Sequence, residues 1–358
     1  MSAPGELRHD DRRRTGETTL IIGGAGFVGA NLADRIASDG GQVLIFDNLS
    51  RPGVERNAAW LQMRHPERVT LRIGDVRDPL AVADAVGRAH RVFHLAAQVA
   101  VTTSLLSPLE DFAINAAGTL NVLEAARARR LPPPLVFTST NKVYGHLDDL
   151  EVTAASTGYQ PCDPDVRRYG LAEDRPLTFG SPYGCSKGAA DQYVLDYART
   201  FGLPATVLRM SCIYGPRQFG TEDQGWVAHF ARRIMDDRPI SIFGDGLQVR
   251  DILYVDDLVD ALLLASRRVE RTRGVAFNMG GGPSNAVSLL RVLELIGHRL
   301  EHTPRLTFGP WRPADQRFYV SDTRRFQEAT GWQPTVPVEA GIGRLVDWLR
   351  SSLTIAET

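Results

Sequence analysis

Apolar and polar residues alternate in blocks along the chain, and the blocks have the lengths of strands and helices. Short, continuous apolar runs predict strands at 19–22, 43–47, 69–73, 91–96, 135–139 and 205–210. Longer helical patterns lie between them, notably at 27–38, 108–130 and 182–201. Continuous rather than alternating apolar strands are typical of a parallel sheet whose two faces are both covered. The pattern therefore predicts an α/β fold with a doubly wound parallel sheet.

Two stretches depart from this alternation. Residues 146–180 are polar and rich in Pro, Gly and Asp, which predicts a long excursion over the mouth of the active site. After residue 210 the elements become shorter, which predicts a smaller lobe made of 211–247 and 281–353. The main domain is then expected to comprise 18–210 and 248–280, with 250–280 returning to its sheet. Residues 1–17 are expected to form a disordered polar tail.

Composition narrows the range of partners. The 358 residues carry 41 Lys and Arg against 42 Asp and Glu, and this balance argues against nucleic acid or an anionic membrane surface. Neither a secretory signal nor an apolar run of membrane-spanning length is visible. Three cysteines without C-x-x-C spacing and eight histidines without metal spacing predict a cytoplasmic, reducing location and no bound metal.

A glycine-rich segment joins the first predicted strand to the first predicted helix. Gly23, Gly26 and Gly29 have G-x-x-G-x-x-G spacing, and Asp47 ends the next strand 18 residues beyond the last of them. Glycine at these positions permits a tight turn, close backbone approach to a pyrophosphate, and helix–strand packing. The helix N-terminus attracts the phosphates. An acid at Asp47 would bind ribose hydroxyls, which favours NAD over NADP, although the nearby Arg51 weakens that preference.

A second group of residues suggests proton transfer. Tyr183 and Lys187 are four residues apart in a predicted helix and so share one face. A neighbouring ammonium favours the phenolate and lowers the pKa of a tyrosine. Thr140 ends the fifth predicted strand at the carboxyl edge, where ligands bind in such sheets. Only Lys142 and Lys187 among the 41 basic residues are lysines, so Lys142 is also expected in or beside the site.

Together these residues resemble the extended short-chain dehydrogenase/reductase family of nucleotide-sugar enzymes. Further matches to the family lie at 93–97, 115–119, 143–145, 214–218, 250–251, 255–257 and 312–315. Within the family, the CDP-paratose 2-epimerases (CDP-tyvelose epimerases) are most similar to 98–104, 139–145, 181–193 and 217–227. The resemblance implies a Rossmann-type domain with bound NAD, a smaller C-terminal lobe that binds a nucleotide sugar, and a homodimer or homotetramer. The helical stretches 108–130 and 182–201 would form the helix bundle of the dimer.

Carried over residue by residue, the resemblance implies three sets of site residues. Catalysis is expected from Thr140, Tyr183 and Lys187. Cofactor binding is expected from Gly23, Gly26, Phe27, Val28, Asp47, Asn48, Asp75, Val76, Leu95, Ala96, Ala97, Asn115, Tyr183 and Lys187, with Asp75 equally interpretable as a strand-end cap. Substrate binding is expected from Gln98, Ser104, Thr140, Asn141, Lys142, Gln224, Arg250 and Arg312, with the two arginines on the diphosphate. His94 is expected to be a packed residue beside the cofactor.

Two departures from the family pattern indicate the type of reaction. The family's 4,6-dehydratases carry an Asp–Glu pair after the catalytic threonine, whereas this chain has Asn141 and Lys142, so the groups for eliminating water are missing. Cys212 lies about where many members, including 4-epimerases, have a sugar-binding Asn. These departures argue against a dehydratase and a 4-epimerase, and the resemblance to the CDP-paratose 2-epimerases implies inversion at C2 of a CDP-hexose through a transient 2-keto sugar, with NAD regenerated in each cycle. Open alternatives are a UDP-sugar 4-epimerase, a decarboxylating relative, a net dehydrogenase and a non-catalytic NAD-binding regulator.

Overall fold

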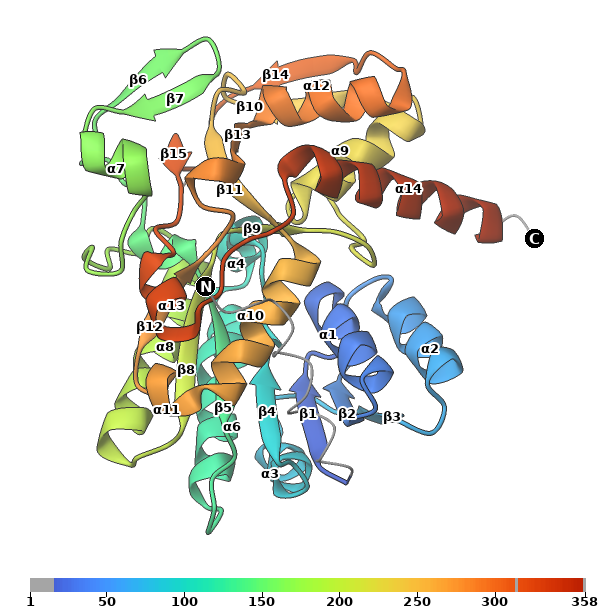
Figure 1. Cartoon of the computed structure of the whole chain (residues 1–358), viewed down its shortest axis with the longest axis vertical. Helices are drawn as coiled ribbons and strands as arrows, with labels where there is room; N and C mark the ends of the chain where they lie inside the picture. The colour runs from blue at the N-terminus through green and yellow to red at the C-terminus, as the bar shows by residue number, and fades with distance from the viewer. Residues whose placement is uncertain (1–15, 313–314, 357–358) are drawn as a thin grey trace, which may run out of the picture.

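The computed structural model describes residues 16–312 and 315–356, with side chains described as far as residue 352. Residues 1–15 of the expected tail and residues 313–314 lie outside this range. Within it, seven parallel strands form the central sheet in the order β12-β8-β5-β4-β1-β2-β3 (Figure 1). Their bounds are β1 Thr18–Ile22, β2 Gln42–Asp47, β3 Val69–Ile73, β4 Arg91–His94, β5 Leu135–Thr140, β8 Ala205–Met210 and β12 Ala276–Met279.

Helices cover both faces of this sheet. One face carries α1 (Phe27–Ser38), α2 (Val54–Arg64) and α10 (Val255–Arg267), and the other carries α3 (Pro79–Gly87), α6 (Gly118–Arg127) and α8 (Pro182–Thr200). Along β1, Ile21 joins the first buried cluster, whereas Leu20 and Ile22 join the second. Because both sides of the inner strands are buried, these strands are mostly apolar, whereas the edge strand β3 is only partly buried. The predicted doubly wound α/β fold is confirmed.

The predicted helix over 108–130 is three segments rather than one. After α4 (Val101–Leu106), α5 spans Pro108–Phe112, a π-helical turn spans Ala113–Ala117, and α6 ends at Arg127. A π-helical turn inserts one residue per turn and so rotates the side chains that follow it. Asn115 lies within this turn and is buried.

The second lobe is built on a small sheet with β11 (Val249–Tyr254) at its centre. This strand pairs with β9 (Cys212–Tyr214), β13 (Ala286–Ser288) and β15 (Phe318–Tyr319). Around it lie α9 (Trp226–Met235), β10 (Ile240–Phe243), α12 (Leu289–Leu300), β14 (Leu306–Gly309), α13 (Arg324–Thr330) and α14 (Val338–Ala356). The expectation that all of 250–280 returns to the main sheet is therefore wrong at its start: α10 and β12 return, with α11 (Val269–Thr272) between them, but β11 belongs to the small sheet.

The excursion over 146–180 lies elsewhere than expected. It forms a hairpin, β6 (Val152–Ala155) and β7 (Gly158–Pro161), followed by α7 (Pro164–Tyr169), beside the second lobe (Figure 1). The backbone N–H of Tyr159 donates to the carbonyl of Leu247 at 3.0 Å, and that of Leu171 donates to Val320 at 2.7 Å. Leu171 packs with the buried ring of Tyr319. These apolar and backbone contacts hold the excursion on the second lobe, and none of its residues lines the main cavity.

Candidate functional site

A cavity of about 850 Å³ opens at the carboxyl ends of the central strands and continues along the second lobe. Nineteen of the residues predicted from the sequence line it directly: Gly23, Gly26, Phe27, Val28, Asp47, Asn48, Asp75, Val76, Leu95, Ala96, Ala97, Gln98, Thr140, Asn141, Lys142, Tyr183, Gln224, Arg250 and Arg312. Three predicted residues, Ser104, Asn115 and Lys187, are buried behind its wall. The structure therefore brings the predicted cofactor, proton-transfer and substrate residues into one space.

The glycine loop at one end of the cavity leaves no room for side chains. A Cβ on Gly23, whose φ is +82°, would lie 2.6 Å from the backbone nitrogen of Ala96. A Cβ on Gly29 would lie 2.4 Å from the carbonyl oxygen of Gly23 and 2.6 Å from the Cα of Gly24. The loop thus exposes backbone to the cavity just before α1 begins, which fits the pyrophosphate of a dinucleotide.

Two carboxylates close the side of this cradle at the ends of β2 and β3. Asp47 accepts hydrogen bonds from the N–H groups of Ala25 at 3.0 Å and Leu49 at 2.9 Å. Burial raises the pKa of Asp47, and these hydrogen bonds oppose the rise. Its carboxylate is therefore fixed beside the glycine loop, at the edge of the cavity where the predicted ribose contact belongs.

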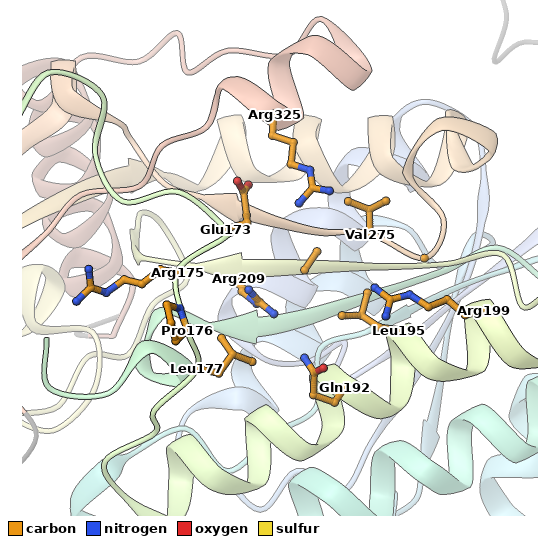
Figure 2. A pocket seen from close by; sticks show the side chains of 12 residues that line it. Glu173, Arg175, Pro176, Leu177, Gln192, Leu195, Arg199, Arg209, Val275 and Arg325 are labelled. Carbon is orange, nitrogen blue, oxygen red and sulfur yellow. The ribbon is translucent and has the colours of Figure 1, made fainter. Parts of the chain in front are cut away.

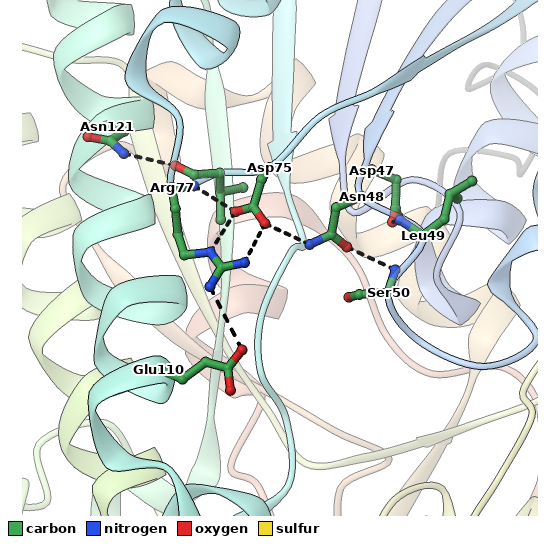
Figure 3. A network of polar contacts seen from close by, with 9 residues as sticks. Asp47, Asn48, Leu49, Ser50, Asp75, Arg77, Glu110 and Asn121 are labelled. Atoms are coloured by element: carbon green, nitrogen blue, oxygen red, sulfur yellow. Dashed lines mark hydrogen bonds and ion pairs between the residues drawn. The ribbon is translucent and has the colours of Figure 1, made fainter.

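The carboxylate of Asp75 accepts hydrogen bonds from Arg77 and Asn48 in a network that Figure 3 shows. It accepts from Nε and Nη2 of Arg77 at 2.9 and 2.7 Å and from Nδ2 of Asn48 at 2.9 Å. The hydrogen bond from Arg77 is the main cause of a lowered pKa at Asp75. Asp75 also accepts from the backbone N–H of Arg77 at 2.9 Å, so it caps the strand end as well as lining the cavity.

Tyr183 stands at the first turn of α8, close to Thr140 at the end of β5. The pKa of Tyr183 is raised to about 12, mainly by burial; Asp111 adds to the rise, and Thr140 and Arg51 oppose it. The two hydroxyl groups are thus brought together, and the surroundings of Tyr183 favour its neutral form. Arg51 was expected only to weaken a cofactor preference, and its effect on Tyr183 depends on a fold contact that the sequence does not reveal.

Lys187 is buried one turn along α8 from Tyr183. Its Nζ donates to the carbonyl oxygen of Thr138 at 2.7 Å and lies 4.1 Å from the ring centre of Phe137. Burial lowers the pKa of Lys187 to about 7, with Asp191 and Asp111 opposing. The expected direct effect of this lysine on the pKa of Tyr183 is therefore not seen here, because its ammonium is anchored to β5.

A buried polar network supports the site from behind. The side-chain oxygen of Asn115 accepts from the N–H of Gln98 at 2.9 Å, and its Nδ2 donates to Ser186 at 3.0 Å and to Asp111 at 3.2 Å. Ser186 also donates to Asp111. Asn115 thereby fixes the backbone of a cavity-lining residue rather than facing the cavity. Sequence reasoning missed Asp111, which in the sequence is indistinguishable from an ordinary acid in the first turn of a helix.

Ser104 and His94 are also held by partners inside the protein. The hydroxyl of Ser104 donates to the carbonyl of Val101 at 2.7 Å, so its substrate role stays a prediction. Nε2 of His94 lies 3.0 Å from Oγ1 of Thr119. Burial lowers the pKa of His94 to about 3, with Lys187 adding to the effect, so the ring is neutral and packed as expected.

Basic side chains gather at the substrate end of the cavity. Arg250 on β11 donates to Asp315 at 2.7 Å, and Arg312 lies 3.4 Å from Asp223 with its guanidinium 3.9 Å above the ring of Phe243. Asp315 was quoted only as part of a family match, and its pairing with Arg250 spans 65 positions. Both expected diphosphate arginines thus reach the cavity, each held by a carboxylate.

Asn141 and Cys212, which the sequence analysis compared with the family pattern, lie nearby. The side chain of Asn141 donates to Gln316 at 3.1 Å. Sγ of Cys212 accepts from Nε1 of Trp226 at 3.4 Å. Cys212 therefore packs against an indole in the cavity wall, which makes this part of the wall less polar than an asparagine would.

A second cavity, of about 320 Å³, lies beside β8 and β12 (Figure 2). Arg199, Arg325 and Glu173 line it, together with Arg209, which forms a buried ion pair with Asp191 at 2.9 Å. None of the predicted site residues lines this cavity.

Among the described residues, no group of three or more His, Cys, Asp or Glu side chains could hold a metal ion. In the same part of the chain, every helix is too short or too polar to cross a membrane.

Comparisons with known proteins agree with this geometry. Residues 19–280 match the model of the NAD dependent epimerase/dehydratase family. CDP-paratose 2-epimerase of Salmonella typhi is 42% identical over 93% of this chain and 99% of its own length. The crystal structure of UDP-glucose 4-epimerase from Thermotoga maritima with UDP-glucose is 31% identical, covers 94% of this chain and 99% of that chain, and has a TM-score of 0.79.

A third relative has its cofactor bound. The UDP-glucose 4-epimerase of Thermus thermophilus, solved in complex with NAD, is 30% identical, has a TM-score of 0.78, and covers 94% of this chain and 99% of that chain. The glycine cradle and the carboxylate of Asp47 suit the same dinucleotide. The chain therefore belongs to the NAD dependent epimerase/dehydratase family, and NAD is its cofactor.

Proposed function

We propose that this protein is a nucleotide-sugar epimerase that inverts C2 of a CDP-linked hexose. The substrate pairs are CDP-paratose with CDP-tyvelose, or CDP-glucose with CDP-mannose. The observation that supports this most is one cavity that joins the glycine cradle, the Tyr183–Thr140 pair and the two arginines Arg250 and Arg312. The 42% identity to an enzyme named CDP-paratose 2-epimerase supports the choice of C2 and of CDP.

In this mechanism the side chains transfer the proton of the sugar hydroxyl and hold the sugar in place. NAD, which the glycine loop and Asp47 would hold, would supply hydride acceptance and return at the sugar carbon. Tyr183, as phenolate, accepts the proton of the C2 hydroxyl, and Thr140 orients that hydroxyl. Because the pKa of Tyr183 is raised to about 12, mainly by burial, deprotonation depends on cationic groups in the assembled site, among which Arg51 already acts.

The arginines keep the sugar nucleotide in place while the oxidised ring turns over. Arg250 and Arg312 present planar guanidinium groups that suit diphosphate oxygens. In this structure they contact Asp315 and Asp223, so the diphosphate takes the place of carboxylates. This exchange suits release as well as binding, because Asp315 and Asp223 can pair with the arginines again when the product leaves.

The position after Thr140 argues against a dehydratase. Asn141 is an amide that is bonded to Gln316, and Lys142 is a cation, so neither supplies the carboxylic acid for eliminating water. A UDP-sugar 4-epimerase is the second candidate, favoured by the fold likeness to a UDP-glucose 4-epimerase. The packing of Cys212 against Trp226 in the sugar region favours the C2 reaction over it.

Proton NMR of the holoenzyme with sugar nucleotides tests the proposal. CDP-paratose and CDP-glucose, unlabelled and deuterated at C2, are the substrates, and UDP-galactose is the control. We expect a new anomeric doublet of manno-type coupling with deuterium retained at C2. Loss of deuterium to solvent would replace hydride transfer by enolisation. Conversion of UDP-galactose alone would make the protein a 4-epimerase, and conversion of none would favour a non-catalytic role.

Location and assembly belong to the proposal as well. A cytoplasmic enzyme suits a nucleotide-sugar substrate and free cysteines, of which Cys162 and Cys185 are exposed. A homodimer suits the exposed apolar side chains Leu106 on α4 and Leu109 on α5. The mass of the assembly in solution tests whether the protein is a homodimer.

A further inference from the structure

Lys142 occupies a place in the cavity that the proton-transfer mechanism does not use. It belongs to the short 3₁₀ helix Asn141–Tyr144, directly after Thr140, and its backbone N–H donates to Oγ1 of that threonine at 3.2 Å. The side chain is half-buried and lines the cavity. Three groups from other segments act on its charge: Asp315, Arg250 and Cys212.

The cavity places Lys142 among the residues of the substrate path. Arg250 is on β11 and Cys212 on β9, and both line the same cavity as Tyr183 and Lys142. Lys142 directly follows Thr140, beside which the reacting carbon must sit, and it shares the cavity with the arginines, where the diphosphate must sit. A hexose that joins these two ends occupies the part of the cavity that Lys142 lines.

The residue type is as informative as the place. Of 41 basic residues, 39 are arginine, so this chain uses lysine at only two positions, and the other, Lys187, is anchored to β5. A guanidinium is a planar fork that suits one fixed orientation of its acceptor. An ammonium is a compact charge with three donors on a flexible stem, so it can follow an acceptor that moves. An epimerase has to hold its sugar in two orientations.

We propose that the Lys142 ammonium binds the hydroxyl and carbonyl oxygens of the hexose ring, rather than the diphosphate, and holds the ring in both orientations that inversion requires. This inference rests on the proposed function and adds a sugar-binding residue to it. The ammonium donates hydrogen bonds to ring oxygens and transfers no proton.

The charge on Lys142 gives the proposal a pH dependence. The pKa of Lys142 is lowered to about 8, mainly by burial; Asp315 and Cys212 oppose the fall, and Arg250 adds to it. The charged donor is present below that pH and is lost above it. Sugar affinity is therefore expected to fall as the pH rises from 7 to 9. An arginine at the same position stays charged throughout this range, so it removes the pH dependence.

Equilibrium binding to the holoenzyme separates the sugar contact from the diphosphate contact. The parent is the Tyr183→Phe protein, in which turnover is expected to be too slow to convert the ligand during a titration, and the variants add Lys142→Met or Lys142→Arg. CDP and CDP-glucose are titrated by calorimetry. UDP and UDP-glucose are titrated in the same way, so that the comparison of nucleotide with sugar nucleotide is valid whichever nucleobase the protein prefers. For Lys142→Met we expect CDP-glucose affinity to fall about tenfold or more, as for a lost hydrogen bond to a charged group, with CDP affinity unchanged within about twofold.

Each other outcome has a definite meaning. An equal loss for CDP and CDP-glucose would assign Lys142 to the diphosphate, and no loss for either would remove it from the substrate site; both overturn the proposal. A loss of affinity between pH 7 and 9 that persists in Lys142→Arg would also overturn it, and this arm is valid even where Lys142→Met folds poorly. If the wild-type enzyme converts no CDP-hexose but the sugar-specific loss is found, the proposed function fails and the sugar contact stands.

Discussion

Tyr183 has surroundings that oppose the ionisation its proposed role requires. Burial raises the pKa of its hydroxyl to about 12, and its closest helper is a neutral hydroxyl, Thr140. Replacing Tyr183 by Phe keeps the ring and removes the oxygen that accepts the proton. We expect turnover to fall at least about 100-fold, the lower range for a positioned acid–base group, with NAD still bound. Product NMR and the NAD content of the purified variant measure the two effects.

Tyr193→Phe is the matched control for that variant, because Tyr193 lies on the same helix and is exposed. It is expected to behave as wild type. Near-normal turnover in Tyr183→Phe, or an equal loss in both variants, would contradict the role of Tyr183 as base.

His94 makes stability depend on pH in a defined direction. Burial lowers the pKa of His94 to about 3 from 6.5, so between these values only the unfolded chain binds the proton. The contribution of the neutral His94 ring to the free energy of unfolding is complete above pH 6.5 and is lost as the pH falls toward 3. Relative to His94→Gln, the wild type should lose about 1.4 kcal/mol of unfolding free energy per pH unit below 6.5. Urea denaturation at pH 8, 6 and 5 measures the difference, and a difference that stays constant across these values would refute it.

Single residues also show where sequence reasoning stops. Asp47, Thr140 and Tyr183 were predictable because each follows a strand or begins a helix, and parallel strands bring their carboxyl ends to one edge. Arg51 and Asp315 were not predictable, since each acts on a residue more than 60 positions away in the chain. The hydrogen bond from Lys187 to Thr138 was missed because its partner lies 49 positions away.

At the scale of elements, the packing of α1 against the glycine loop decides whether the cofactor cradle forms. A methyl group on Gly29 would lie 2.4 Å from the carbonyl of Gly23, and backbone cannot move aside as a side chain can. We therefore expect Gly29→Ala to lose bound NAD and to unfold at a lower temperature. Gly87→Ala, at the end of α3 with no atom within 4 Å of the added Cβ, is the control and should be neutral or slightly stabilising. NAD content and thermal unfolding of the two variants test this, and retention of NAD in Gly29→Ala would show that the loop is looser than the structure indicates.

The bounds of a strand or helix were predictable where its own run of apolar residues marked its ends. The strands at 69–73 and 205–210 and the helix at 27–38 have the predicted bounds. Strand 205–210 and the apolar face of the helix are buried, whereas 69–73 is an edge strand with Ile73 exposed. The π-helical turn at Ala113–Ala117 was not predictable, since one inserted residue barely changes helical periodicity. The hairpin β6–β7 was missed because its partner surface lies on β13 and β15, more than 100 positions later.

At the scale of the whole molecule, the two lobes share the main cavity, and one outer surface remains apolar. Leu106 and Leu109 are each 85% exposed, and their helices α4 and α5 both pack against α8. Water-exposed leucines grouped on adjoining helices indicate a surface that is covered in the working protein. The helix bundle expected from the sequence would bury this surface against a second copy.

Replacing Leu109 by Glu tests that assembly directly. Burying one leucine side chain stabilises an interface by about 1.5–3 kcal/mol, and a carboxylate in its place adds a desolvation cost. We expect light scattering to give the mass of a dimer or tetramer for the wild type and a smaller assembly for Leu109→Glu at the same concentration. Leu80→Glu is the control, because Leu80 is 81% exposed on α3, away from α4 and α5 in the chain. A wild type with the 39.4 kDa mass of one chain would refute the prediction, and an equal effect of both substitutions would place the interface elsewhere.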